Sequence, residues 1–225
     1  MAILMFGSIG TLLDASELQR EAFNRAFREH DLDWSWRRDD YRERLARAGG
    51  ANRIAEYAAE RGEALDPKAV HRTKTRIFGE LLREGGHAPR DGVAATVRAV
   101  RDAGHRLAMV STTSVANIDN VLAAIAGEVP RDAFEVVLDG TQVEKGKPDP
   151  ECYETALKRL GGTADEAVAV EDNVDGVTAA LAAGIKTVAF PNANTAAHEF
   201  PGADFVVTGP LEADAVLAML DGRAA

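Results

Sequence analysis

Three short groups of polar residues in this chain are of a kind that binds an anion or a metal ion. The first is the hydroxyl run Ser111–Ser114, which follows the apolar stretch Leu107–Val110 and precedes a helical pattern. Hydroxyls and free backbone amides at the start of a helix bind anions such as phosphate. Ser114 also suits an ordinary helix cap, so the local residues leave both interpretations open.

The second group is a single lysine and the third is a pair of carboxylates. Lys147 lies between a glycine and a proline, where its ammonium either holds a phosphate oxygen as a point charge or is simply solvated. Glu171 and Asp172 end an apolar run, which suits Mg²⁺ or complements the positive end of the next helix. Gly10-Thr11 adds a tight turn with a hydroxyl.

These residues form one site only if the fold brings them to one edge of a sheet. After residue 87, strand-like runs alternate with helical patterns, which is typical of a parallel sheet covered on both faces. The runs are Leu107–Val110, Phe134–Leu138, Ala167–Val170, Thr187–Phe190 and Phe205–Val207. Helices are expected near 92–103, 114–126, 151–160, 174–183 and 211–221. Ligands of such sheets bind beyond the carboxyl ends of the strands, where the polar groups lie.

The remaining part of the chain predicts a second, helical unit. The apolar run Ala2–Phe6 must join the same sheet, because a lone strand is not stable. Residues 15–86 carry helical patterns and no strand signals, with Ser16 as the expected cap of the first helix. We therefore expect an α/β core of residues 1–14 and 87–225, with a helical cap of residues 15–86 inserted after the first strand. Trp34 and Trp36 are expected to pack within that cap.

Composition excludes several classes of protein. The chain has 225 residues and a formal net charge of −10, so we expect no nucleic-acid partner. No apolar run reaches the ~18 residues of a membrane span, so no membrane association is expected. The single cysteine, Cys152, cannot form an internal disulfide, which favours a reduced, cytoplasmic protein. His30, His71, His105 and His198 lack metal-ligand spacing and are expected to be solvated.

Taken in order, these pieces resemble the haloacid dehalogenase superfamily of phosphatases. The resemblance covers nearly the whole chain and is to the branch of β-phosphoglucomutases and Calvin-cycle sugar-bisphosphate phosphatases. The family's second, third and fourth motifs are matched by Ser111 in AMVSTTSVAN, Lys147 in KGKPDP and Glu171-Asp172 in AVAVEDNVDG. Its first motif, Asp-x-Asp-Gly-Thr-Leu, reads GSIGTL at residues 7–12. The fold is therefore expected to be a Rossmann-like parallel sheet with an inserted cap.

The resemblance implies a two-step phosphatase mechanism. The first aspartate attacks phosphorus, and the second protonates the leaving group and then activates water. Mg²⁺ is held by the first aspartate, by the backbone carbonyl of the second and by the acids matched here by Glu171 and Asp172. The residues that the resemblance assigns to phosphate binding are Thr11, Ser111, Thr112 and Lys147.

The resemblance also extends into the cap. The segment AGGANRI at 48–54 looks like the substrate-facing loop of the sugar-bisphosphate phosphatases. Ala51 replaces its usual lysine, while Arg53 is kept. Glu17 is the second cap residue expected to face a substrate.

The first motif departs from the family at both catalytic positions. Gly7 occupies the position of the nucleophile and has no side chain, while Ile9 occupies the acid–base position and has no titrating proton. Dehalogenases of the superfamily keep the first aspartate, so Gly7 argues against their chemistry as well. Ser8 lies between the two positions and is expected to point away from the substrate, because alternate residues near a strand end face opposite ways. The lost carboxylate also weakens the expected Mg²⁺ site.

Two hypotheses follow from different classes of protein. The first is a pseudo-phosphatase that keeps its phosphate-binding residues and binds a phosphorylated small molecule or a protein partner of unknown identity. The second is an active hydrolase on a sugar phosphate that uses non-standard catalytic residues, such as Glu17, Arg53 or His87.

Overall fold

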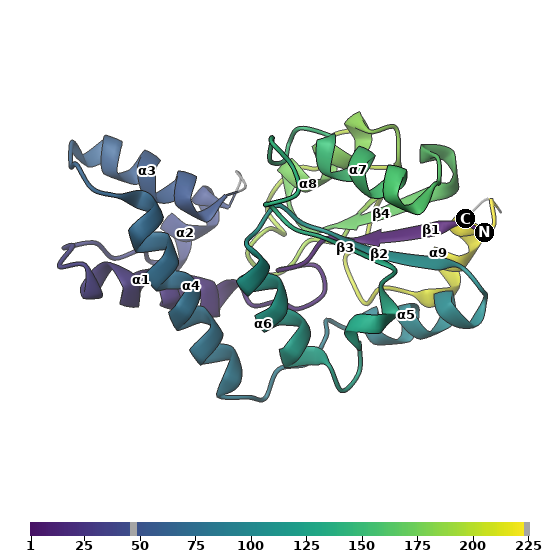
Figure 1. Cartoon of the computed structure of the whole chain (residues 1–225), viewed down its shortest axis with the longest axis horizontal. Helices are drawn as coiled ribbons and strands as arrows, with labels where there is room; N and C mark the ends of the chain where they lie inside the picture. The colour runs from purple at the N-terminus through teal and green to yellow at the C-terminus, as the bar shows by residue number, and fades with distance from the viewer. Residues whose placement is uncertain (46–48, 223–225) are drawn as a thin grey trace.

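The computed structural model describes residues 1–45 and 49–222, and helices cover both faces of a six-stranded parallel sheet (Figure 1). The order of the strands across the sheet is β3-β2-β1-β4-β5-β6. The strands are β1 (Ile3–Phe6), β2 (Arg106–Val110), β3 (Val136–Leu138), β4 (Ala167–Glu171), β5 (Lys186–Ala189) and β6 (Phe205–Val206). The predicted parallel α/β fold is confirmed, with every strand end within two residues of its expected position.

Strand β1 lies at the centre of the sheet, although the other five strands follow it in the sequence only from Arg106 onward. β1 pairs in parallel with β2 and β4, so that Leu4 lies opposite both Leu107 and Val168. All four residues of β1 are buried, which explains its unbroken apolar run, since a strand covered on both faces has no polar side. This placement brings the carboxyl ends of β1, β2 and β4 together at one edge.

The two faces of the sheet are covered by different helices (Figure 1). These helices are α5 (Val93–Asp102), α6 (Val115–Ile125), α7 (Glu151–Leu160), α8 (Val174–Ala182) and α9 (Ala213–Leu220). Ile3 and Met5 share one buried cluster with residues of α7 and α8, while Leu4 and Phe6 share the other with residues of α5, α6 and α9. Successive side chains of a strand point to opposite faces, which separates the two clusters.

Four helices between β1 and α5 form the predicted helical insertion (Figure 1). They are α1 (Ser16–Glu29), α2 (Arg38–Arg44), α3 (Gly50–Arg61) and α4 (Pro67–Arg83). The long helix α4 packs against α1 and α3 and also contacts α6 of the sheet layer. The division of the chain into two domains at 14/15 and 86/87 stays a prediction.

Aromatic side chains fill the interior of this helical cap. The ring of Phe27 lies 5.2 Å from that of Trp34 and 4.8 Å from that of Trp36, in edge-to-face contact with both. Phe23 lies 4.8 Å from Trp36, and both tryptophans are buried. Burial of such rings contributes most of the apolar area of a small helical unit. The prediction that Trp34 and Trp36 pack within the cap is confirmed.

The start of α1 differs from the expected arrangement. Ser16 is the first residue of the helix and not its cap, and the backbone N–H of Ser16 donates to Asp14 Oδ1 over 3.2 Å. The expectation that Ser16 caps α1 is therefore wrong, because a carboxylate two residues earlier already accepts a free amide of the first turn. Ser16 is buried instead.

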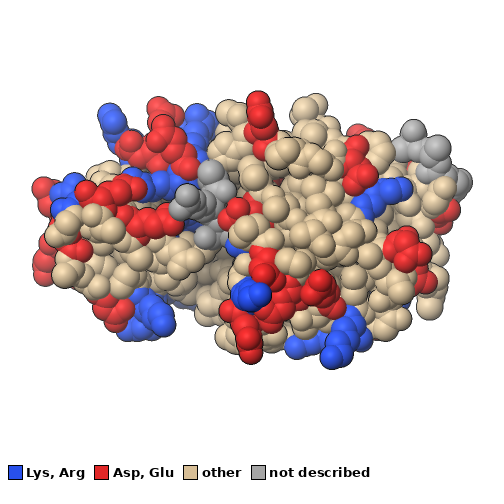
Figure 2. Space-filling view, turned by 90° about the horizontal axis from the view of Figure 1, so that it is seen from above, with Lys and Arg blue, Asp and Glu red and all other residues tan. Residues whose placement is uncertain are grey.

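Charged side chains of both signs are interspersed over the face of the molecule shown in Figure 2. On that face, lysine and arginine side chains do not gather into one basic surface. Among the described residues, no helix is both long enough and apolar enough to cross a membrane.

Candidate functional site

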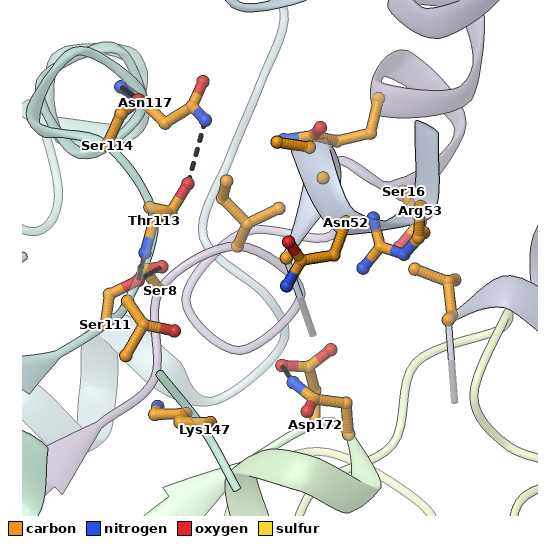
Figure 3. A pocket seen from close by; sticks show the side chains of 18 of the residues that line it. Ser8, Ser16, Asn52, Arg53, Ser111, Thr113, Ser114, Asn117, Lys147 and Asp172 are labelled. Atoms are coloured by element: carbon orange, nitrogen blue, oxygen red, sulfur yellow. Dashed lines mark hydrogen bonds between the residues drawn. The ribbon is translucent and has the colours of Figure 1, made fainter. Parts of the chain in front are cut away.

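A cleft of about 350 Å³ lies between the cap helices and the carboxyl ends of β1, β2 and β4. Figure 3 shows its side chains converging from both parts of the chain. The residues that line the core side include Ser8, Ile9, Ser111, Thr112, Lys147, Glu171 and Asp172. The residues that line the cap side include Ser16, Gln19, Tyr41, Asn52, Arg53, His71 and Lys74.

The hydroxyl run after β2 serves both roles left open by the sequence. Ser114 caps α6 by accepting the N–H of Asn117 over 3.4 Å. Ser111 is buried at the end of β2, and its Oγ accepts the N–H of Thr113 over 3.2 Å. Ser111 and Thr112 also line the cleft. The start of α6 therefore presents hydroxyls to a ligand while its own first turn is already capped.

Ser8 faces the cleft, contrary to expectation. Its Oγ lies 2.8 Å from Ser111 Oγ, and both side chains line the cleft (Figure 3). The expectation that Ser8 points away is wrong because β1 ends at Phe6, so that strand alternation no longer applies at residue 8. Ser8 instead begins a turn, in which its carbonyl accepts the N–H groups of Thr11 and Leu12.

Lys147 forms an ion pair with Glu171 beneath the cleft. Lys147 Nζ contacts Glu171 Oε1 and also donates to the carbonyl of Val110 over 2.8 Å. The hydroxyl of Tyr153 donates to the same Glu171 oxygen over 2.5 Å. Burial opposes the charge of Lys147, but the neighbouring Glu171 carboxylate outweighs it and raises the pKa of Lys147. The structure thus places both predicted residues together, bonded to each other.

Thr11 lies under Asp172 and not on the cleft surface. The Thr11 hydroxyl is fully buried and donates to Asp172 Oδ1 over 2.8 Å. Gly10 allows this contact, because its φ is 89° and a Cβ there would collide with the Asp172 carboxylate. Burial and the neighbouring Glu171 raise the pKa of Asp172 to about 7, against the opposing hydrogen bond from Thr11.

The carboxylates of this edge do not fit a resident Mg²⁺. Gly7 offers no side-chain oxygen, and Oε1 of Glu171 is held by Lys147 and Tyr153. The two oxygens of Asp172 accept hydrogen bonds from buried side chains. In the described residues no group of three or more histidine, cysteine, aspartate or glutamate side chains is arranged to hold a metal ion. Mg²⁺ prefers several free oxygen ligands in near-octahedral geometry, and without a residue-7 carboxylate this edge is one ligand short.

On the cap side, Arg53 lines the cleft and Glu17 does not. Arg53 is anchored by its Nε, which donates to the carbonyl of Arg44 over 2.9 Å. Tyr41 lies nearby, and burial raises its pKa to about 12, so its hydroxyl stays protonated. Glu17 instead pairs with Arg20 at the cap–core contact and is absent from the cleft lining, as is His87. The structure therefore brings Arg53 to the cleft and leaves Glu17 beside it.

The loop after β5 forms hydrogen bonds to the cap helices next to Glu17. Asn194 is buried in the loop after β5, where its Nδ2 donates to Glu17 Oε1 over 3.1 Å. Its Oδ1 accepts a hydrogen bond from Arg42 Nε of α2, also over 3.1 Å. Arg42 further donates to the carbonyl of Ala193. These bonds fix the helices α1 and α2 over the sheet edge and define the width of the cleft.

The sequence did not single out Lys74, which is the most unusual cation of the cleft. Its side chain is 2% exposed and donates to Gln19 Oε1, with Nζ 4.9 Å from the rings of both Phe23 and Phe78. No carboxylate of the described residues pairs with it. Burial, reinforced by the nearby Arg53, lowers the pKa of Lys74 well below its usual range. An anionic ligand group would supply the missing counter-ion.

His71, expected to be solvated, lies one helical turn before Lys74 and lines the same cleft. That expectation is wrong because α3 begins against the ring: a Cβ built on Gly50 would lie 2.5 Å from His71 Nε2. Burial, together with the charges of Lys74 and Arg53, lowers the pKa of His71 to about 4. The imidazole is therefore neutral at physiological pH and can accept or donate one hydrogen bond.

Replacing His71 by glutamine should make the protein less sensitive to mild acid. Between pH about 4 and about 6.5 the unfolded chain binds a proton at this histidine that the folded protein does not, so its contribution to stability falls as the pH falls. Thermal unfolding of both proteins at about pH 7.5 and about pH 5 tests this. The melting temperature of the native protein relative to His71→Gln should be lower at the acid pH. An equal gap at both values would contradict the assigned pKa.

Comparison with known proteins shows extensive similarity. Residues 6–184 match the model of the haloacid dehalogenase-like hydrolases. Protein CbbY of Cereibacter sphaeroides is 38% identical over 206 residues, which cover 89% of each chain. A crystal structure of CbbY from Rhodobacter sphaeroides in complex with phosphate has a TM-score of 0.90 and 37% identity, covering 98% of this chain and 100% of that one. A CbbY variant in complex with xylulose-(1,5)bisphosphate has a TM-score of 0.87 and 37% identity, covering 93% and 95%.

Proposed function

Because this chain belongs to the haloacid dehalogenase-like hydrolase family, we propose that it is a catalytically silent member that binds a sugar bisphosphate or a metabolite of similar charge. The observation that carries the proposal is the pair Gly7 and Ile9, which stand where the family's mechanism needs two carboxylates. The competing hypothesis is an active sugar-phosphate phosphatase with other catalytic residues.

The remaining groups at the sheet edge do not replace the lost chemistry. A serine becomes a nucleophile when an adjacent base takes its proton. The hydrogen bond of the Ser8 side chain in the described structure is to Ser111, another hydroxyl with no basic character. Ile9 lines the cleft with a hydrocarbon side chain, so it offers no proton to a leaving group. Phosphoryl transfer through an aspartyl-phosphate therefore has neither its nucleophile nor its acid.

The two ends of the cleft favour a ligand with two anionic groups. Ser111 and Thr112 present hydroxyls at the core end, next to the start of α6. Arg53 supplies positive charge at the cap end, and Lys74, which pairs with no carboxylate of the described residues, gains charge when an anion binds beside it. The similar CbbY variant is in complex with xylulose-(1,5)bisphosphate, a ligand with two phosphates. A bisphosphate bridging both ends is therefore the ligand that we propose.

Calorimetry with xylulose-(1,5)bisphosphate, a sugar monophosphate and inorganic phosphate tests this function. The bisphosphate should bind the native protein at least about tenfold more tightly than the monophosphate, because only it reaches the hydroxyls of the core end and the cationic side chains of the cap end together. The recovered bisphosphate should still carry both phosphates after prolonged incubation. Ser111→Ala should weaken binding of all three compounds, because they share the core end.

Two outcomes would contradict this proposal. No heat with any of the three compounds would rule out the phosphate-binding role. Steady release of inorganic phosphate that is lost in Ser8→Ala or Lys147→Ala would show that the chain is an active phosphatase. Release that both variants retain would come from a contaminating enzyme.

We propose a reduced, cytoplasmic location, because the chain has a single cysteine and therefore no internal disulfide. The thiol of Cys152 is buried and burial raises its pKa, which makes it unreactive. A protein partner stays unidentified, and neither a nucleic acid nor a membrane is part of the proposed function.

A further inference from the structure

The space beside Gly7 is filled by two neighbouring side chains. A Cβ built on Gly7 would lie 2.5 Å from Thr11 Oγ1 and 2.7 Å from Glu171 Oε2. Atoms of this kind do not approach so closely without repulsion, so a side chain at position 7 requires both the Thr11 hydroxyl and the Glu171 carboxylate to move aside. Glu171 therefore occupies volume that a residue-7 carboxylate would otherwise take.

Glu171 also supplies the negative charge beside Lys147. An ammonium has three N–H donors, and those of Lys147 meet Glu171 Oε1, the Val110 carbonyl at 2.8 Å and Tyr153 Oη at 3.5 Å. The side chains of Lys147 and Glu171 are 6% and 1% exposed. A buried charge without a partner is strongly destabilising, so the two groups depend on each other. The pair satisfies itself without any ligand.

Asp172 is engaged in a similar way by donors from three segments. Its Oδ1 accepts hydrogen bonds from Thr11 at 2.8 Å and from Asn173 at 3.3 Å, and its Oδ2 accepts one from Asn192 at 3.1 Å. Using Asp172 as a metal ligand would take its oxygens from the buried donors of Thr11 and Asn192, which costs free energy. A dication that took Glu171 Oε1 or Asp172 Oδ1 as a ligand would have to displace existing bonds there.

We infer that Glu171 replaces the missing residue-7 carboxylate as the counter-ion of Lys147, and that the cleft consequently binds its phosphorylated ligand without a divalent cation. Loss of one carboxylate also removes a negative charge that a dication would neutralise. The phosphorylated ligand in this inference is taken from the proposed function. The independence from a divalent cation is argued from the contacts of Glu171 and Asp172.

Binding of inorganic phosphate to the native protein, by calorimetry in EDTA and in millimolar MgCl₂, tests the second part. The dissociation constants should agree within about twofold, and a tenfold tighter value with Mg²⁺ would overturn the inference. Thermal unfolding without phosphate gives a separate reading: the native melting temperature should not change with Mg²⁺, and a saturable rise would overturn the inference. If phosphate does not bind in either buffer, the proposed function fails, while the thermal comparison still decides on the metal.

A charge-swap series tests the role of Glu171 itself. Glu171→Ala leaves Lys147 buried without its counter-ion and should lower the melting temperature by several degrees. Adding Gly7→Asp to Glu171→Ala should recover much of this loss, because the new carboxylate enters the vacated space next to Lys147. Gly7→Asp alone should not stabilise the native protein, since two carboxylates then compete for one place. The same effect of Gly7→Asp in both backgrounds would show that the two positions are uncoupled and would overturn the inference.

Discussion

Replacing both Gly7 and Ile9 by aspartate should turn a silent protein into a Mg²⁺-dependent sugar-phosphate phosphatase. Removing the nucleophile from a cooperating catalytic unit costs about six orders of magnitude in kcat in a well-studied protease, so restoring it should raise turnover by at least about four. The cleft and the hydroxyls at the start of α6 are already in place for this reaction, and Lys147 becomes available once the new residue-7 carboxylate displaces that of Glu171. Phosphate release from xylulose-(1,5)bisphosphate and from sugar monophosphates, measured beside the native protein, gives the result.

Three controls make this result specific. Each single replacement should stay nearly silent, because Gly7→Asp lacks the proton donor and Ile9→Asp lacks the nucleophile. Lys147→Ala in the double variant should abolish the gain, because the transferring phosphoryl group loses its cation. If the native protein already hydrolyses these compounds at the rate of the double variant, Gly7 and Ile9 are not disabling and the proposed function is wrong.

Replacing Lys74 by methionine should remove the cap end of the ligand site and stabilise the free protein. The dissociation constant of xylulose-(1,5)bisphosphate should rise about 100-fold, since a hydrogen-bonded charge contributes roughly 1.5–3 kcal/mol. Binding of inorganic phosphate should change less than about twofold, because that anion uses the core end. The melting temperature should rise, because methionine fills the space between Phe23 and Phe78 without burying an amine whose charged form has no counter-ion.

Proton uptake on ligand binding gives a second test of the role of Lys74. Because burial lowers the pKa of Lys74, an anion bound beside it raises that pKa again, and the complex takes up protons. The apparent binding enthalpy of the native protein should therefore depend on the ionisation enthalpy of the buffer, and that dependence should shrink in Lys74→Met. Lys68→Met is the matched control, because Lys68 is an exposed lysine on the same helix. Equal losses of affinity in both variants would point to long-range charge and not to a subsite at Lys74.

The sheet and its polar edge were predictable because their signals are local. A strand such as β1 has to be apolar throughout when both of its faces are covered, and the parallel arrangement then fixes which ends of the strands meet. Ser111, Lys147 and the acidic pair come directly after such runs or in the loop before a helix. Their common location follows from topology and needs no knowledge of side-chain contacts.

The contacts among these residues were not predictable in the same way. Lys147 and Glu171 are separated by 24 residues, and their pairing depends on the space beside Gly7. Ser8 reaches Ser111 because the chain turns after β1 ends at Phe6; the apolar run marks that end, but no pattern gives the direction of a side chain in the turn beyond it. Sequence patterns give element positions to within a residue or two, and a side-chain direction reverses within that error.

Lys74 left a signal that is visible in retrospect. It lies four residues after Val70 and four before Phe78, on the apolar stripe of α4 that the sequence predicts as the buried face. A lysine within such a stripe either destabilises the fold by burying its ammonium or binds an anionic ligand. His71 lies off this stripe. It is partly buried because the start of α3 packs against its ring, and the spacing of the residues in α4 does not predict that contact.

The aromatic core of the cap gives this protein an optical asymmetry. The chain contains two tryptophans, and both lie inside the helical insertion, while the sheet has none. The indole N–H of Trp34 donates to Glu63 over 3.0 Å, whereas that of Trp36 has no hydrogen-bond partner among residues 1–45 and 49–222, so the two rings have different electrostatic surroundings. Tryptophan fluorescence, excited selectively because Tyr153 lies in α7, therefore reports on the cap alone, while the circular dichroism of the peptide bonds averages over the whole chain. Melting curves recorded by the two methods follow different parts of the molecule, without any label having to be introduced.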